Sequence, residues 1–116
     1  MYQRAVDLAV DIYKISDNGS FGKDLGLKDQ CRRAAVSISS NIAEGEELDT
    51  EKQAVKHLYY ARGSSAELRA QLLIAHKVGY LDLDTFSILQ EKCKILSVMI
   101  KKLINSKMLK IEKNSN

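Results

Sequence analysis

Hydrophobic residues recur every three or four positions along most of the chain, which is the spacing of one face of an α-helix. In the first such segment, about residues 2–16, the apolar face consists of Ala5, Leu8, Ala9, Ile12 and Ile15. The stretch SDNGSFGKDLG at 16–26 interrupts the pattern with glycines and short polar residues, which favour turns. It predicts a connecting loop whose Phe21 packs back onto the helices.

Three further helices are predicted downstream. Residues 27–44 have an apolar face, and Gly45 is expected to end this helix in a left-handed conformation. Residues 50–78 carry a heptad seam of Ala54, Leu58, Ala61, Ser65, Leu68, Leu72 and Ala75. Residues 83–108 carry a second seam of Phe86, Leu89, Cys93, Leu96, Ile100 and Leu103, and 109–116 are expected to be a frayed tail. The pattern therefore predicts a single all-α domain over 1–116, an antiparallel up-down four-helix bundle.

The composition agrees with a helical protein, because the chain has no proline, no tryptophan and only six glycines. Charged residues interrupt the apolar positions throughout, so neither a signal peptide nor a membrane span is predicted, and a cytoplasmic location is expected. Cys31 and Cys93 lie far apart without a paired spacing. They are therefore expected to be reduced thiols with a structural role.

Polar residues accompany the apolar face of the second predicted helix. Arg33, Ser37, Asn41 and Glu44 follow one another at spacings of four, four and three, so they form a track along one side of that helix. The stretch SISSNIAEGEE at 37–47 contains most of this track. We interpret it as a helix end and polar joint, with Asn41 and Glu44 bonding to a neighbouring helix.

Small residues gather in the middle of the third predicted helix, in the sequence ARGSSAEL at 61–68. Gly63 there costs about 1 kcal/mol relative to alanine, so a compensating contact is expected. We predict that small residues allow this helix to approach the small-residue face of the second helix closely. Arg62, Ser64 and Glu67 would then lie opposite the polar track.

Two interpretations of these polar residues remain, a structural network and a catalytic site. Catalysis by Ser37 or Ser40 would require a histidine base oriented by a third group. The two histidines, His57 and His76, belong to no such pattern, and neither follows a Glu-x-x-His spacing for a di-iron site. The sequence therefore predicts no catalytic residue, metal, cofactor or small-molecule substrate, and no enzymatic activity.

Positive charge is concentrated at the C-terminal end. Residues 1–91 carry eleven Lys and Arg against fourteen Asp and Glu, whereas 92–116 carry seven Lys against one Glu. These lysines fit either a solvated helix face or a sequence-independent contact with RNA or DNA phosphates. The candidate nucleic-acid-binding residues are Lys92, Lys94, Lys101, Lys102, Lys107 and Lys110.

The last predicted helix is apolar over a wider face than one seam requires. Ile88, Ile95 and Met99 extend this face, so part of it is expected to be buried against another subunit.

Two stretches, RRAAVSISSNIAEGEE and HLYYARGSSAELRAQLLIAHKVGYL, resemble bacterial four-helix bundle proteins encoded in intervening sequences of large-subunit ribosomal RNA genes. The resemblance implies a ring-like homopentamer without known enzymatic activity. On the matching positions, it assigns Arg33, Asn41, Glu44, Gly63, Ser64 and Glu67 to helix joining and subunit contacts.

A related branch resembles accessory proteins of diversity-generating retroelements, which are basic pentamers that bind nucleic acid and a reverse transcriptase. This implies an RNA or DNA partner, although residues 1–91 here are less basic than that branch. The sequence therefore leaves two alternative functions. One is a homo-oligomeric assembly or adaptor module, and the other is a nucleic-acid-binding accessory protein.

Overall fold

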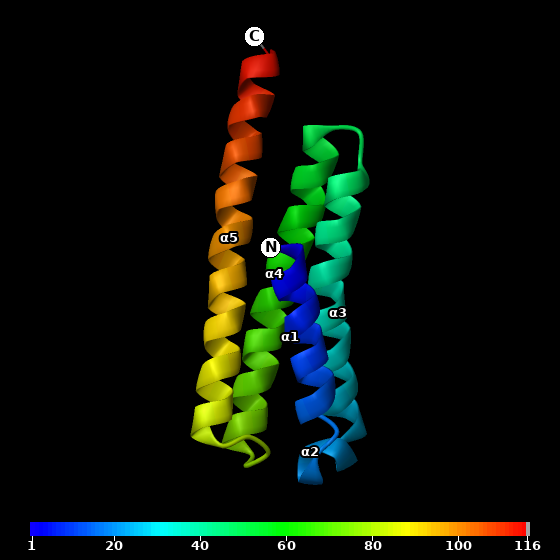
Figure 1. The fold of residues 1–116 in the computed structure, drawn as a ribbon, viewed down its shortest axis with the longest axis vertical. Coiled ribbons are helices and arrows are strands. Elements are labelled where there is room, and N and C mark those ends of the chain that lie inside the picture. Colours follow the sequence, from blue (N-terminus) through cyan, green and yellow to red (C-terminus); the bar gives the residue numbers. More distant parts are fainter. Residues whose placement is uncertain (116) are drawn as a thin grey trace.

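In the computed structural model, which describes residues 1–115, the chain forms helices and no strand over that range. The helices are α1 (Tyr2–Ile15), α2 (Gly19–Lys23), α3 (Leu25–Glu47), α4 (Glu51–Lys77) and α5 (Leu83–Ser115). The four long helices run alternately up and down, so that consecutive ones are antiparallel (Figure 1). The predicted all-α up-down bundle is confirmed.

Short polar side chains start three of the helices by accepting a hydrogen bond from a backbone N–H of the first turn. Asp24 Oδ1 accepts from Leu27 N at 3.1 Å, and Thr50 Oγ1 accepts from Gln53 N at 3.2 Å. Asp82 Oδ1 accepts from Thr85 N at 2.7 Å, and this bond lowers the pKa of the Asp82 carboxyl. The helix starts thus follow directly from local sequence.

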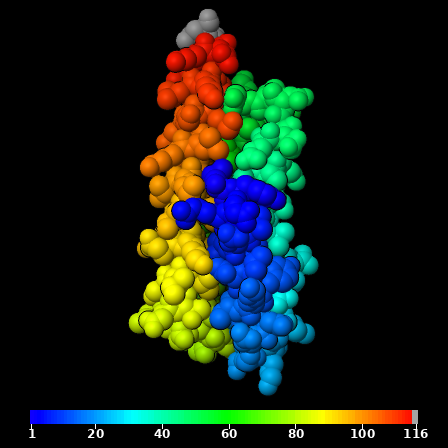
Figure 2. Space-filling view, in the orientation of Figure 1, coloured from blue at the N-terminus to red at the C-terminus, as the bar shows by residue number. Residues whose placement is uncertain are grey.

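The core lies between α1, α3, α4 and α5, and its largest contacts join α3 to α4 and α4 to α5. All seven residues of the predicted α4 seam are buried. The molecule is 56 Å long, and α1 spans only part of that length (Figure 1). Figure 2 shows α1 lying across one face between α3 and α5, where its contact with α5 is smaller than its contact with α3.

Three local expectations need correction. Gly45 does not end α3, which continues to Glu47, and its backbone is not left-handed. The predicted loop at 16–26 contains the short helix α2, whose Phe21 is 1% exposed and stacks on Tyr80 at 5.6 Å between ring centroids. Helix α5 continues through Ser115, past the expected end at 108, while residue 116 lies outside the described residues.

Candidate functional site

Five side chains form a hydrogen-bonded polar joint between α3 and α4, namely Ser37, Asn41 and Glu44 with His57 and Ser64. Ser64 Oγ donates to Ser37 Oγ at 2.9 Å, and Asn41 Nδ2 donates to the Ser37 carbonyl at 2.9 Å. His57 Nδ1 lies 3.0 Å from Asn41 Oδ1 and 3.1 Å from Glu44 Oε2. Both neighbours are acceptors, so Nδ1 carries the hydrogen. His57 was not among the predicted site residues.

Of the other three polar residues predicted for this joint, Arg33 and Glu67 border it and Arg62 does not. Arg33 is largely exposed and pairs with Asp29 of its own helix at 2.8 Å. Arg33 and Glu67 line a polar groove together with Ser37 and Ser64 of the joint. Arg62 lies on the opposite side of α4, in a groove with α5. The prediction that Arg62 faces the polar track of α3 is therefore wrong.

Close approach of α3 and α4 occurs at Gly45 and not at Gly63. A Cβ added at Gly45 would lie 3.4 Å from the Ala54 carbonyl oxygen, so Gly45 packs directly against the α4 backbone. A Cβ added at Gly63 would meet no heavy atom within 4 Å, because Gly63 is on the exposed side of α4. The small-residue contact was predicted correctly for this helix pair but assigned to the wrong glycine.

Five cationic side chains line a groove of about 450 Å³ between α4 and α5, called here the basic groove. Ser97 and Val98 complete its walls. Arg69 is fixed in place, because its Nε donates to Gln90 Oε1 at 3.2 Å and Gln90 Nε2 donates to the Arg69 carbonyl at 2.8 Å. The cations of the basic groove are Arg62, Arg69, Lys94, Lys101 and Lys102. Within residues 1–115, none of them takes part in an ion pair.

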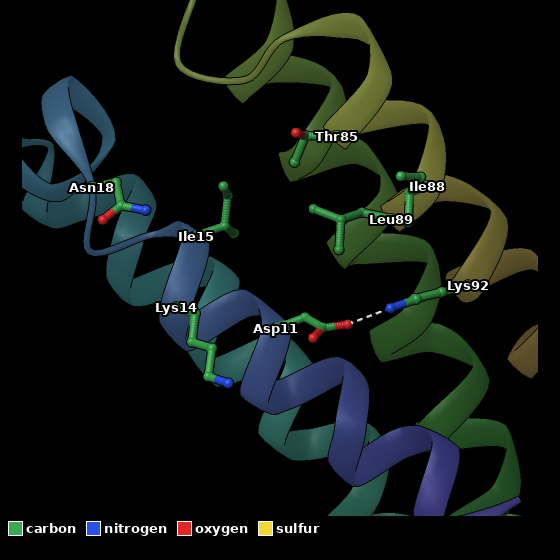
Figure 3. A pocket seen from close by; sticks show the side chains of 8 residues that line it. All are labelled: Asp11, Lys14, Ile15, Asn18, Thr85, Ile88, Leu89 and Lys92. Atoms are coloured by element: carbon green, nitrogen blue, oxygen red, sulfur yellow. Dashed lines mark hydrogen bonds and ion pairs between the residues drawn. The ribbon is translucent and has the colours of Figure 1, made fainter.

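The six lysines predicted to bind nucleic acid do not share one surface. Lys92 faces α1 and pairs with Asp11 at 2.6 Å (Figure 3), and Lys107 pairs with Glu51 of α4 at 2.8 Å. The hydrogen bond from Lys107, together with the charges of Lys107 and Lys110, lowers the pKa of the Glu51 carboxyl. Three of the predicted lysines, Lys94, Lys101 and Lys102, lie in the basic groove. They share it with two arginines that were not predicted to bind nucleic acid.

The three residues predicted as an oligomer interface all belong to α5 and differ in exposure. Ile88 is 57% exposed and lines a cleft of about 280 Å³ between α1 and α5 (Figure 3). Ile95 and Met99 are half-buried.

A second apolar surface, the outer α4 face, was not predicted. It is solvent-exposed and consists of Tyr60, Gly63, Ala66, Ala70, Leu73 and Ile74, while Tyr59 lies at its border with the basic groove, beside Lys101. These residues recur at helical spacings, so they share the side of α4 that points away from the core. Glu67 lies at the edge of this face. Sequence reasoning missed it because only the buried seam of the helix was followed.

The described residues contain no cluster of His, Cys, Asp and Glu that fits a metal ion, and no helix long and apolar enough to cross a membrane. His57 bonds to Asn41 and Glu44, while His76 Nδ1 contacts the Leu81 carbonyl at 2.9 Å and its ring stacks on Phe86. Neither imidazole is paired with a serine hydroxyl.

Residues 1–102 match the family model of the 23S rRNA-intervening sequence protein. The chain belongs to this family. A solved structure from Bacteroides thetaiotaomicron, a protein of unknown function from the S23 ribosomal protein family, superposes with a TM-score of 0.83. It is 20% identical and the match covers 89% of this chain and 96% of that one, which shows a shared fold. No curated protein matches the chain significantly. The family assignment indicates no catalytic class.

In this member of the intervening-sequence protein family, the polar joint follows a regular ladder. Positions 30, 37 and 44 on α3 lie opposite positions 71, 64 and 57 on α4, each pair one heptad from the next. Ser37 bonds to Ser64 and Glu44 contacts His57, while Gln30 and Gln71 line the same groove. The spacing of seven on both helices is the signal from which His57 could have been found.

Replacing Asn41 with alanine should lower the free energy of unfolding by about 1–2 kcal/mol, because it removes the hydrogen bonds that the Asn41 side chain makes with Ser37 and His57 at a half-buried position. Urea unfolding followed by circular dichroism measures the change. Ser39→Ala is the matched control, since the Ser39 hydroxyl bonds only to the Val36 carbonyl of its own helix. Equal losses in both variants would show that the joint does not stabilise the α3–α4 pair.

Proposed function

We propose that this protein is a non-enzymatic, cytoplasmic module that assembles into a homo-oligomer and serves as a scaffold or adaptor. The observation that carries the proposal is the exposed outer α4 face. Contiguous exposed apolar surface of this kind marks association sites in soluble proteins. Its centre is flat, because Gly63, Ala66 and Ala70 have little or no side chain, so a helix of another subunit can approach closely.

A closed ring requires two different, complementary surfaces on every subunit. The chain has two apolar surfaces on different helices, the outer α4 face and the strip of Ile88, Ile95 and Met99 on α5. This arrangement supports a heterologous interface, as in the ring-like pentamer that the family resemblance implies. Association would also bury apolar surface that a small domain cannot cover by itself.

Light scattering after size exclusion should give a mass several times that of the 13.0 kDa chain, about 65 kDa for five copies. Ile74→Asp should shift the mass to the monomer, since Ile74 is 52% exposed and the charge would be buried on association. Circular dichroism of the variant should remain helical.

Val10→Asp is the control, because Val10 is 45% exposed and belongs to α1, which contributes no residue to either apolar surface. A wild-type protein that is monomeric at micromolar concentration would refute the proposal. An oligomer that survives Ile74→Asp would exclude the outer α4 face as the interface.

Nucleic-acid binding is the second candidate function. It is favoured by the basic groove, where five cations lie together without an acidic partner among the described residues. Assembly would give the oligomer one copy of this groove per subunit. Several grooves together would bind a long polyanion more tightly than a single groove.

A further inference from the structure

Two rows of positive charge face each other across the basic groove. Arg62 and Arg69 are seven residues apart on α4, and Lys94 and Lys101 are seven residues apart on α5. At 1.5 Å of rise per residue, each row is about 10 Å long. Because the rows line the same groove, one extended anion lying in it would contact both helices.

The groove cations differ from the other cations at helix contacts. Lys28, Arg32, Lys92 and Lys107 each pair with an aspartate or glutamate, so their charge is compensated within the chain. The groove cations have no such partner within residues 1–115, and because they line one groove their like charges repel one another. An anionic ligand would remove this repulsion, and the fixed Arg69 guanidinium presents a planar donor that suits phosphate.

One end of the groove carries an exposed aromatic ring. Tyr59 is 46% exposed, and the Lys101 Nζ lies 5.9 Å from its ring centroid. Val98, which is 54% exposed, adds an apolar contact inside the groove. Cations that follow a backbone, beside an aromatic ring on which a base can stack, are the combination that binds single-stranded nucleic acid without sequence preference.

We infer that the basic groove binds the phosphate backbone of single-stranded nucleic acid, with one base stacked on Tyr59. This rests on the second candidate function and assigns it to a defined site. A single strand is favoured over a duplex, because both rows of cations line the same groove and a stacked base must be free of its pairing partner.

The test is fluorescence anisotropy of a labelled 20-nucleotide oligouridine with the full-length protein at 50 and 200 mM salt. About five phosphate contacts predict a loss of affinity of about 100-fold between the two conditions. The double variant Arg69→Glu with Lys101→Glu should bind at least about tenfold more weakly at low salt. Lys14→Glu with Lys23→Glu, which makes the same charge change on exposed residues of α1 and α2, should bind like wild type.

Tyr59→Ala separates stacking from charge. It should weaken binding of the single strand by about tenfold and leave the salt dependence unchanged. A 20-base-pair RNA duplex should bind more weakly than the single strand and should not respond to Tyr59→Ala. Equal binding of strand and duplex would overturn the stacking assignment.

The outcomes distinguish the site from the function. Binding of oligouridine that the groove double variant does not reduce would overturn the groove while leaving nucleic-acid binding in place. No binding by wild type at 50 mM salt would overturn both. Displacement of bound RNA by a polyglutamate peptide at equal charge concentration would instead identify the groove as a site for acidic protein segments. Light scattering on each variant checks that the oligomer is unchanged.

Discussion

Replacing Leu68 with alanine should lower the free energy of unfolding by about 3 kcal/mol, because the side chain is 0% exposed in the middle of α4. Helix α4 contacts both α3 and α5 along its length, so a cavity there removes contacts with two neighbours at once. Urea unfolding at several protein concentrations measures the change, since self-association would make the apparent stability depend on concentration.

Leu109→Ala is the matched control for Leu68→Ala. Leu109 is 60% exposed on α5, so the same substitution there should change the free energy of unfolding by less than about 0.5 kcal/mol. A loss of similar size in both variants would contradict the assignment of α4 as the central helix of the core.

The fold could be predicted because the buried positions repeat with helical spacing. Every member of the predicted α4 seam is buried, and Leu89, Cys93, Leu96 and Ile100 of the α5 seam are buried as well. Amphipathic periodicity relates residues three and four positions apart in one segment, so it can be recognised without knowledge of the tertiary arrangement.

The errors at the helix ends arose where tertiary packing overrides a local signal. Glycine often ends helices, but α3 continues through Gly45, which is buried against the α4 backbone at Ala54. The tail of α5 is polar and was expected to fray, yet Ile111 packs against the core and the helix continues past it. Neither contact is visible from a single segment.

The candidate site was predicted only in part, because its residues come from different helices. The sequence placed Asn41, Glu44 and Ser64 at the α3–α4 joint, where the structure has them. It did not predict that His57 bonds to Asn41 and Glu44. The basic groove required the register of α4 against α5, which brings Arg62 and Arg69 beside Lys94 and Lys101. A count of lysines along the last helix could not separate Lys94 and Lys101, which line the groove, from Lys92 and Lys107, which form ion pairs.

The two thiols should be almost unreactive in the folded protein. Burial raises the pKa of Cys31 from its ordinary value of 9.0 to about 11 and that of Cys93 to about 12. Because the thiolate is the reacting form and both thiols are buried, an aromatic disulfide reagent at pH 8 should modify native Cys31 at least about 100-fold and native Cys93 at least about 1,000-fold more slowly than the unfolded chain. Absorbance of the released thiolate measures both rates, and Cys31→Ala and Cys93→Ala assign them.

The same shifts predict how stability depends on pH. The folded state keeps both thiols protonated above the pH at which the unfolded chain loses these protons, so their contribution is constant below about pH 9 and falls between pH 9 and 12. The double variant Cys31→Ala with Cys93→Ala should lose less stability over that range than wild type. Rapid modification of both thiols in the native protein would contradict this and would reopen a redox role. Slow modification of both thiols, together with a loss of stability between pH 9 and 12, would instead support a role of the sulfurs in packing.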